Sequence, residues 1–121
     1  MIVYAGLGFA VAMLEKLVRL RTGWMPTSQQ FADISIPGPV EIEQIGPADV
    51  PGWDGPDRAA SQAYGDAWYD SGRTAVLIVP SVAAMGLEHN VWISQRHPSF
   101  PQITAGRPRP VIWDARLFAA D

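Results

Sequence analysis

The 121-residue sequence contains no cysteine and only two histidines. Without cysteine the chain can form no disulfide and carry out no thiol chemistry, and two histidines alone disfavour a zinc site. Basic residues are also few, since nine Lys and Arg stand against twelve Asp and Glu, for a formal net charge of −3. This balance lacks the basic surface that a nucleic-acid backbone requires, so we expect no direct contact with nucleic acid and no bound metal.

Long hydrophobic runs are absent too. The apolar start, residues 1–14, has no basic leader and is shorter than the roughly 20 residues that a bilayer-spanning helix needs. We therefore expect neither a signal peptide nor membrane contact, and a cytoplasmic location. With 48% hydrophobic residues the chain can bury a core, and its length predicts a single domain over residues 1–121.

The clearest element is a strand over residues 75–79, where five consecutive apolar residues indicate burial on both faces. Pro80 cannot donate a hydrogen bond to a neighbouring strand, so the strand should end there and place Ser81 at the rim of the sheet. A hydroxyl at that place is a candidate for binding or catalysis. The alternative is that Ser81 only bonds the backbone of the following turn, which is the commoner use of serine.

A short strand is expected over residues 2–5, and a helix over residues 7–21. The helix is predicted from apolar residues at spacings of four, three and four, which place on one stripe Leu7, Val11, Leu14 and Val18. Glu15 lies about 80° round the helix from Leu7, at the edge of this stripe, and so can face a cleft. The alternative for Glu15 is an ion pair with Arg19, four residues on.

Residues 31–43 predict two short strands or one broken strand. Apolar and acidic residues alternate from position 40 to position 43, so Val40 and Ile42 should face the core while Glu41 and Glu43 face water. Proline and glycine then make residues 46–57 an irregular loop, which Trp53 should anchor to the core.

A second helix is expected over residues 57–71, with Asp57 as its N-cap and Gly72 as its stop. One face of this helix carries Ala60, Ala63, Tyr64, Ala67 and Trp68. Gly65 lies beside that face, where the lack of a side chain allows another part of the chain to come close. Further strands are expected over residues 90–94 and 111–114. This order of elements predicts an α+β or mixed α/β domain.

Common catalytic motifs do not assign a function. No phosphate-binding loop of the P-loop or GxGxxG kind is present, and neither HExxH nor GxSxG occurs. A nucleophilic triad can be written from Ser81, His97 and Asp114, but His97 stands beside Pro98 in an expected turn, so we disfavour this arrangement.

Taken in order along the chain, several short segments form a recognisable pattern: Val3-Tyr4-Ala5, Ala12 to Glu15, Gly65 to Trp68, Val79-Pro80-Ser81, Asn90, His97-Pro98 and Asp114 to Leu117. In sequence and spacing the chain resembles the RES domain family, whose members are the toxins of Xre-RES toxin–antitoxin systems. The resemblance covers nearly the whole chain. It implies an α+β fold of the ADP-ribosyltransferase type, with a mixed sheet and helices, and an Xre-type antitoxin as protein partner.

The same resemblance implies that NAD is the substrate and that its nicotinamide glycosidic bond is broken, by hydrolysis, by phosphorolysis or by transfer of ADP-ribose to a protein. Glu15 would stabilise the positive charge that develops on the ribose and orient its 2′-hydroxyl or an attacking water. Tyr4 would stack on or bond the nicotinamide ribose portion, Ser81 would bond the nicotinamide or ribose, and Asn90 would complete the NAD pocket. Tyr4, Glu15 and Ser81 are thus the expected catalytic residues.

Two features depart from the family pattern. The family has an arginine upstream of the tyrosine, expected to contact the NAD phosphates, but only three residues precede Tyr4 here. Where the family often has Asn-Pro before the His-Pro pair, this chain has Ser94-Gln95-Arg96. We therefore expect either a sequence that lacks an N-terminal segment or a catalytically impaired remnant that only binds its antitoxin. An acidic interaction domain unrelated to the family is the third alternative.

The missing arginine also predicts weak binding of NAD, because a guanidinium forms strong paired hydrogen bonds with phosphate. Arg19 and Arg21 are expected to be poor substitutes for it, since they follow Glu15 near the end of the first helix.

Overall fold

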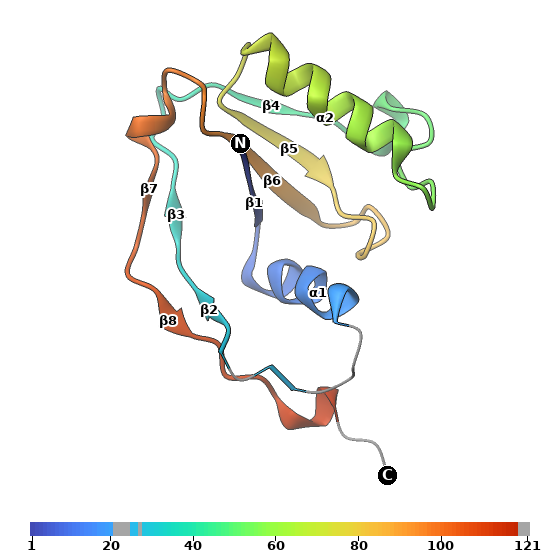
Figure 1. Cartoon of the computed structure of the whole chain (residues 1–121), viewed down its shortest axis with the longest axis vertical. Helices are drawn as coiled ribbons and strands as arrows, with labels where there is room; N and C mark the ends of the chain where they lie inside the picture. Colours follow the sequence, from blue (N-terminus) through green and yellow to red (C-terminus); the bar gives the residue numbers. More distant parts are fainter. Residues whose placement is uncertain (21–24, 27, 119–121) are drawn as a thin grey trace.

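A four-stranded sheet forms the centre of this computed structural model, which describes residues 1–20, 25–26 and 28–118. Across the sheet the strands lie in the order β1 (Ile2–Gly6), β6 (His89–Ser94), β5 (Val76–Pro80) and β4 (Ile42–Gln44). Figure 1 shows α2 (Ala59–Ser71) beside β4 and β5, and α1 (Phe9–Arg19) at the end of β1 and β6. Because β4 is parallel to β5 while the other pairs are antiparallel, the sheet is mixed, and the predicted α+β class is confirmed.

The centre of the sheet is β5, as the apolar run predicts. Val76, Leu77 and Val79 are at most 1% exposed, because β6 and β4 flank the strand and α2 packs near it. The strand includes Pro80, and Ser81 follows it at the rim, fully buried. This burial gives Ser81 no access to bulk water, so its hydroxyl needs a partner from the protein.

The first helix is shorter than predicted, and the predicted stripe is wrong at both ends. Leu7 and Val18 are 58% and 60% exposed, and of the four stripe residues only Val11 is buried. Leu7 lies in the bend before the helix, so its spacing of four from Val11 does not place the two side chains on one helical face. Close contact with the sheet comes instead at Gly6, where an added Cβ would lie 2.8 Å from the Ala12 backbone nitrogen.

The second helix ends at Gly72, which adopts the left-handed conformation with φ of 64°, as predicted. Its N-cap is Arg58 and not Asp57, although the Asp57 carboxylate accepts a hydrogen bond from the Ala59 backbone N–H at 3.1 Å. The packed face is narrower than predicted, since Trp68 and Gly65 are buried while Ala63 and Ala67 are exposed.

Val40 is buried and Glu41 is exposed, as predicted, but the next two residues, in strand β4, are reversed. Ile42 is half exposed, whereas the Glu43 carboxylate turns toward α2 and accepts hydrogen bonds from Arg73 at 2.7 and 2.8 Å and from the Tyr64 hydroxyl at 3.0 Å. These bonds explain the reversal, because they give a partly buried carboxylate a charged partner. The hydrogen bonds from Arg73 lower the pKa of the Glu43 carboxyl below its ordinary value.

This lowered pKa makes Glu43→Gln a test of the ion pair through acid stability. A carboxyl with a depressed folded-state pKa stabilises the fold fully above its unfolded pKa, and loses that contribution as the pH falls through the folded-state value. We expect urea unfolding at pH 7 and pH 3 to show a smaller loss of stability in Glu43→Gln than in the wild type, by about 1 kcal/mol or less for a partly exposed pair. Glu41→Gln, at an exposed position, should keep the wild-type difference; an unchanged difference in Glu43→Gln would contradict the pairing.

Two short ladders continue one another beside the main sheet. Strand β2 (Gln30–Phe31) pairs with β8 (Arg109–Pro110), and β3 (Ile34–Ser35) pairs with β7 (Thr104–Ala105), which Figure 1 shows as one narrow ribbon. The predicted strand over residues 111–114 is wrong. Pairing ends after one bond from the Val111 N–H to the Gln29 carbonyl, and Trp113 is buried against Phe118 in irregular chain.

The part of the chain that the structure describes also contains three short 3-10 turns, η1 (Pro47–Asp49), η2 (Phe100–Gln102) and η3 (Ala115–Leu117). Neither α1 nor α2 has the length and hydrophobicity needed to traverse a bilayer, and the described residues include no other helix that does.

Candidate active site

The ends of β5 and β6 bring two polar side chains to the inner side of α1. Asn90 stands opposite Val79 of β5 on one side and Gly6 of β1 on the other. Ser81 follows β5 directly, and its backbone N–H donates to the Glu88 carbonyl at 2.9 Å, which holds it beside the start of β6. The turn at Gly6 then leads into α1, which carries Glu15 over both residues.

Glu15, Ser81 and Asn90 form what we call the carboxylate clamp. The Ser81 hydroxyl donates to Glu15 Oε2 at 2.7 Å, and Asn90 Nδ2 donates to the same oxygen at 2.6 Å. The structure therefore brings together three of the four predicted site residues, from positions far apart in the chain. The alternatives drawn for Glu15 and Ser81 do not hold, because the Ser81 hydroxyl bonds Glu15 and no ion pair joins Glu15 to Arg19 among the described residues.

The clamp leaves two acceptors unused. Both bonds to Glu15 go to Oε2, so Oε1 has no protein partner in the described part of the chain. Asn90 Oδ1 is buried and also without a hydrogen-bond partner. A buried acceptor without a partner costs about 1 to 3 kcal/mol, so Asn90 Oδ1 would gain from a hydroxyl or amide that donates to it.

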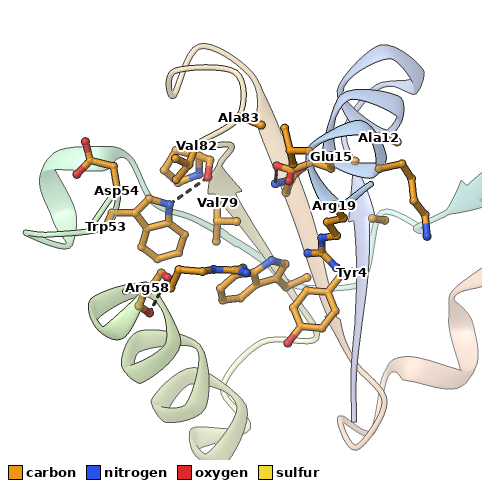
Figure 2. A pocket seen from close by; sticks show the side chains of 18 of the residues that line it. Tyr4, Ala12, Glu15, Arg19, Trp53, Asp54, Arg58, Val79, Val82 and Ala83 are labelled. Atoms are coloured by element: carbon orange, nitrogen blue, oxygen red, sulfur yellow. Dashed lines mark hydrogen bonds between the residues drawn. The ribbon is translucent and has the colours of Figure 1, made fainter. Parts of the chain in front are cut away.

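An open cleft of about 590 Å³ adjoins the clamp and is lined by Glu15 and Asn90. Its wall is aromatic, and Figure 2 shows Tyr4 and Trp53 in it. Trp92 meets Tyr4 edge-on, with ring centroids 5.7 Å apart, and lies at 30° to the Trp53 ring at the same separation. The Trp53 indole N–H donates to the Pro80 carbonyl at 3.1 Å, which confirms its predicted anchoring role. Tyr4 is 61% exposed in this cleft, opposite Trp92 on the neighbouring strand.

Sequence reasoning missed Trp92 as a site residue, although a signal was present. Trp92 is two residues after Asn90 in β6, and side chains two apart in a strand lie on one face. The face that carries Asn90 into the clamp must therefore carry Trp92 into the same cleft.

Other chemistries have no matching geometry. His97 Nδ1 accepts from the Ser99 N–H at 3.0 Å, Asp114 bonds Arg116, and Ser81 bonds Glu15, so the disfavoured triad does not assemble. Within residues 1–20, 25–26 and 28–118, no three His, Asp or Glu side chains gather as they would around a metal ion.

Ser81→Ala separates a role in the site from a role in the fold. We expect the variant to weaken ligand binding or turnover, because Oε2 of Glu15 loses one of its two donors, with a stability change within about 1 kcal/mol. Ser94→Ala is a matched control, since Ser94 is equally buried but its hydroxyl has no hydrogen-bond partner. Thermal melts and NAD turnover are the readouts. A large fall in melting temperature with normal turnover would make Ser81 a structural residue.

The fold and the site define an α+β domain with a clamped carboxylate at the end of an aromatic cleft, and comparison with known proteins gives its family. The RES domain model matches residues 1–114, so the chain belongs to the RES domain family. The chain is also similar to the Prs ADP-ribosylating toxin of Sphingobium sp. (strain YBL2), with 37% identity over 120 residues that cover 96% of this chain and 74% of that toxin. The resemblance drawn from short segments is thus confirmed.

Proposed function

We propose that the protein is a toxin that uses NAD as its substrate, breaks the bond between nicotinamide and ribose, and transfers ADP-ribose to a protein. The observation that carries this proposal is the carboxylate clamp, which holds Glu15 at an open cleft with one oxygen that has no hydrogen-bond partner among the described residues. Membership of the RES domain family supports NAD as the substrate, and similarity to an ADP-ribosylating toxin supports transfer.

The residues of the cleft suit NAD chemically. Among the described residues, Glu15 Oε1 and Asn90 Oδ1 accept no hydrogen bond, so ribose hydroxyl and carboxamide groups could donate to them, and Trp92 and Tyr4 offer aromatic surface to a planar ring. A volume of about 590 Å³ lies within the usual range of roughly 300–1,000 Å³ for small-molecule sites.

In this proposal Glu15 acts on the ribose. Ser81 and Asn90 fix Oε2, so the carboxylate keeps one orientation and presents Oε1 to the cleft. Breaking the glycosidic bond leaves positive charge on the ribose, and a preorganised carboxylate nearby stabilises that charge without first having to reorient. Tyr4 and Trp92 hold the ring portion of the substrate in place from the aromatic wall of the cleft.

The second candidate, an inactive remnant that only binds its antitoxin, is less well supported. A remnant has no need of two side chains from separate strands bonded to one carboxylate oxygen, yet Ser81 and Asn90 both bond Glu15. An antitoxin of the Xre type, encoded beside the toxin, remains the proposed protein partner.

Labelled NAD tests transfer directly. The purified chain is mixed with bacterial extract and NAD labelled on its adenylate half, and proteins are then examined for the label. Transfer predicts a labelled protein band together with free nicotinamide. Nicotinamide without a labelled band would favour hydrolysis, or phosphorolysis if its release requires inorganic phosphate. No nicotinamide release under any of these conditions would contradict the proposal.

A further inference from the structure

The cleft gathers positive charge in a chain whose net charge is −3. Three cationic side chains line it, Lys16, Arg19 and Arg58. Two carboxylates, Glu15 and Asp54, line it as well, so the cationic side chains exceed the anionic ones by one among the described lining residues. Glu15 is held away from the cations by Ser81 and Asn90, which both bond its Oε2. An acidic protein that places cations around one cleft favours an anionic ligand there.

Arg58 is held in this cleft by an unusual backbone. It is the N-cap of α2 and adopts the left-handed conformation, with φ of 60° and ψ of 18°. Such a conformation costs energy for a residue with a side chain, and it persists where the surroundings enforce it, often at binding sites. The Ser61 hydroxyl donates to the Arg58 carbonyl at 3.1 Å and so helps to hold the turn.

The two arginines of the cleft have no carboxylate partner among the residues that the structure describes. Ion pairs in the described residues engage Arg73, Arg96, Arg109 and Arg116. Neither Arg58 nor Arg19 forms an ion pair with any described residue, and both reach into the cleft from opposite helices (Figure 2). Their guanidinium groups are therefore available to a ligand.

We propose that Arg58 and Arg19 bind the diphosphate of a dinucleotide from the two sides of the cleft, which rests on the proposed function in taking NAD as the ligand. Guanidinium groups form paired, charge-assisted hydrogen bonds with phosphate oxygens. Arg19 follows Glu15 by four residues, or about 6 Å along the axis of α1, so a ribose held at Glu15 brings its 5′-phosphate close to Arg19. Arg58 then meets the second phosphate from α2.

This assignment changes the expectation drawn from the sequence. From the sequence, Arg19 is expected to be a poor substitute for the arginine that the family pattern places upstream of Tyr4, because Arg19 lies near the end of the first helix. The structure places Arg19 in the same cleft as Glu15 and adds Arg58, which the sequence did not single out. We therefore expect NAD to bind this chain with two guanidinium partners.

The test compares ligands with and without phosphate on variants that preserve the fold. Arg58→Asn removes the charge but keeps a residue that tolerates the left-handed conformation and caps helices well, so its melting temperature should not fall. Calorimetric titration should show ADP-ribose binding weakened at least about tenfold in Arg58→Asn, a loss typical of a charge-assisted pair, with a shallower dependence on salt. Arg19→Gln should behave alike, and Arg58→Lys should restore part of the affinity.

Two controls make the result specific. Nicotinamide riboside, which has no phosphate, should bind wild type and Arg58→Asn equally. Arg107→Asn removes an arginine that does not line the cleft and should leave ADP-ribose binding unchanged. Equal affinity of ADP-ribose for wild type and Arg58→Asn would overturn the assignment, as would the failure of the wild type to bind ADP-ribose. Arg58-dependent binding of ADP-ribose without cleavage of NAD would support the phosphate site and contradict the proposed function.

Discussion

Glu15→Gln is expected to lower the rate of NAD cleavage by about 10² or more, the scale on which single charge-stabilising groups act in active sites. Glutamine keeps the size of glutamate, and its amide oxygen can still accept from Ser81 and Asn90. The atom that faces the cleft then becomes an NH2 group, which donates hydrogen bonds and carries no negative charge. The variant should therefore fold normally and bind ligand in the same place, but lose most of its activity.

Initial rates of NAD loss, measured by chromatography on the purified proteins, give the comparison. Glu41→Gln is the control, since Glu41 is exposed and lies outside the cleft, and its rate should match the wild type. Wild-type rates in Glu15→Gln would remove Glu15 from catalysis and leave the clamp a structural feature.

Gly65→Val is expected to damage the fold and the cleft together. An added Cβ at Gly65 would lie 2.7 Å from a ring carbon of Trp92, too close for any real contact. Trp92 cannot move freely, because the rings of Trp53 and Tyr4 both pack against it. Overpacking of this kind costs about 1 to 3 kcal/mol, and relief of the clash moves the indole toward the space where the ligand binds.

Ala63→Val separates this effect from the helix propensity of valine. Ala63 lies in the same helix but is exposed, so Ala63→Val should lose stability only through the lower helix propensity of valine. We expect Gly65→Val to melt well below Ala63→Val and to bind NAD more weakly. Equal melting temperatures and equal NAD affinities would mean that Trp92 moves without consequence, and would remove it from the wall of the site.

Local signals in the sequence predict part of this structure well. The apolar run before Pro80 predicts the central strand and the rim position of Ser81. A short run of consecutive apolar residues that ends at a proline is typical of a strand buried on both faces. Gly72 as the end of α2 and close packing at Gly65 follow from the conformational freedom of glycine. Family resemblance, and not periodicity, is what grouped Glu15 with Ser81 and Asn90.

Features that depend on distant partners were not predictable in this way. Glu43 faces inward because Arg73 and Tyr64 bond it, and nothing in the alternating pattern around it reveals those partners. Arg58 is a further case, since its left-handed backbone has no signature in a residue type that usually avoids it. The apolar spacing around α1 misled because it included Leu7, which lies before the first turn of the helix.

The most direct test of the proposed site is a crystal structure of Glu15→Gln with NAD, in which slow turnover should leave the substrate intact. We predict the nicotinamide ribose beside residue 15, the ring portion against Trp92 and Tyr4, and the diphosphate between Arg58 and Arg19. NAD bound outside this cleft, or a cleft that stays empty at saturating NAD, would contradict the assignment of the carboxylate clamp as the place where NAD is bound and cleaved.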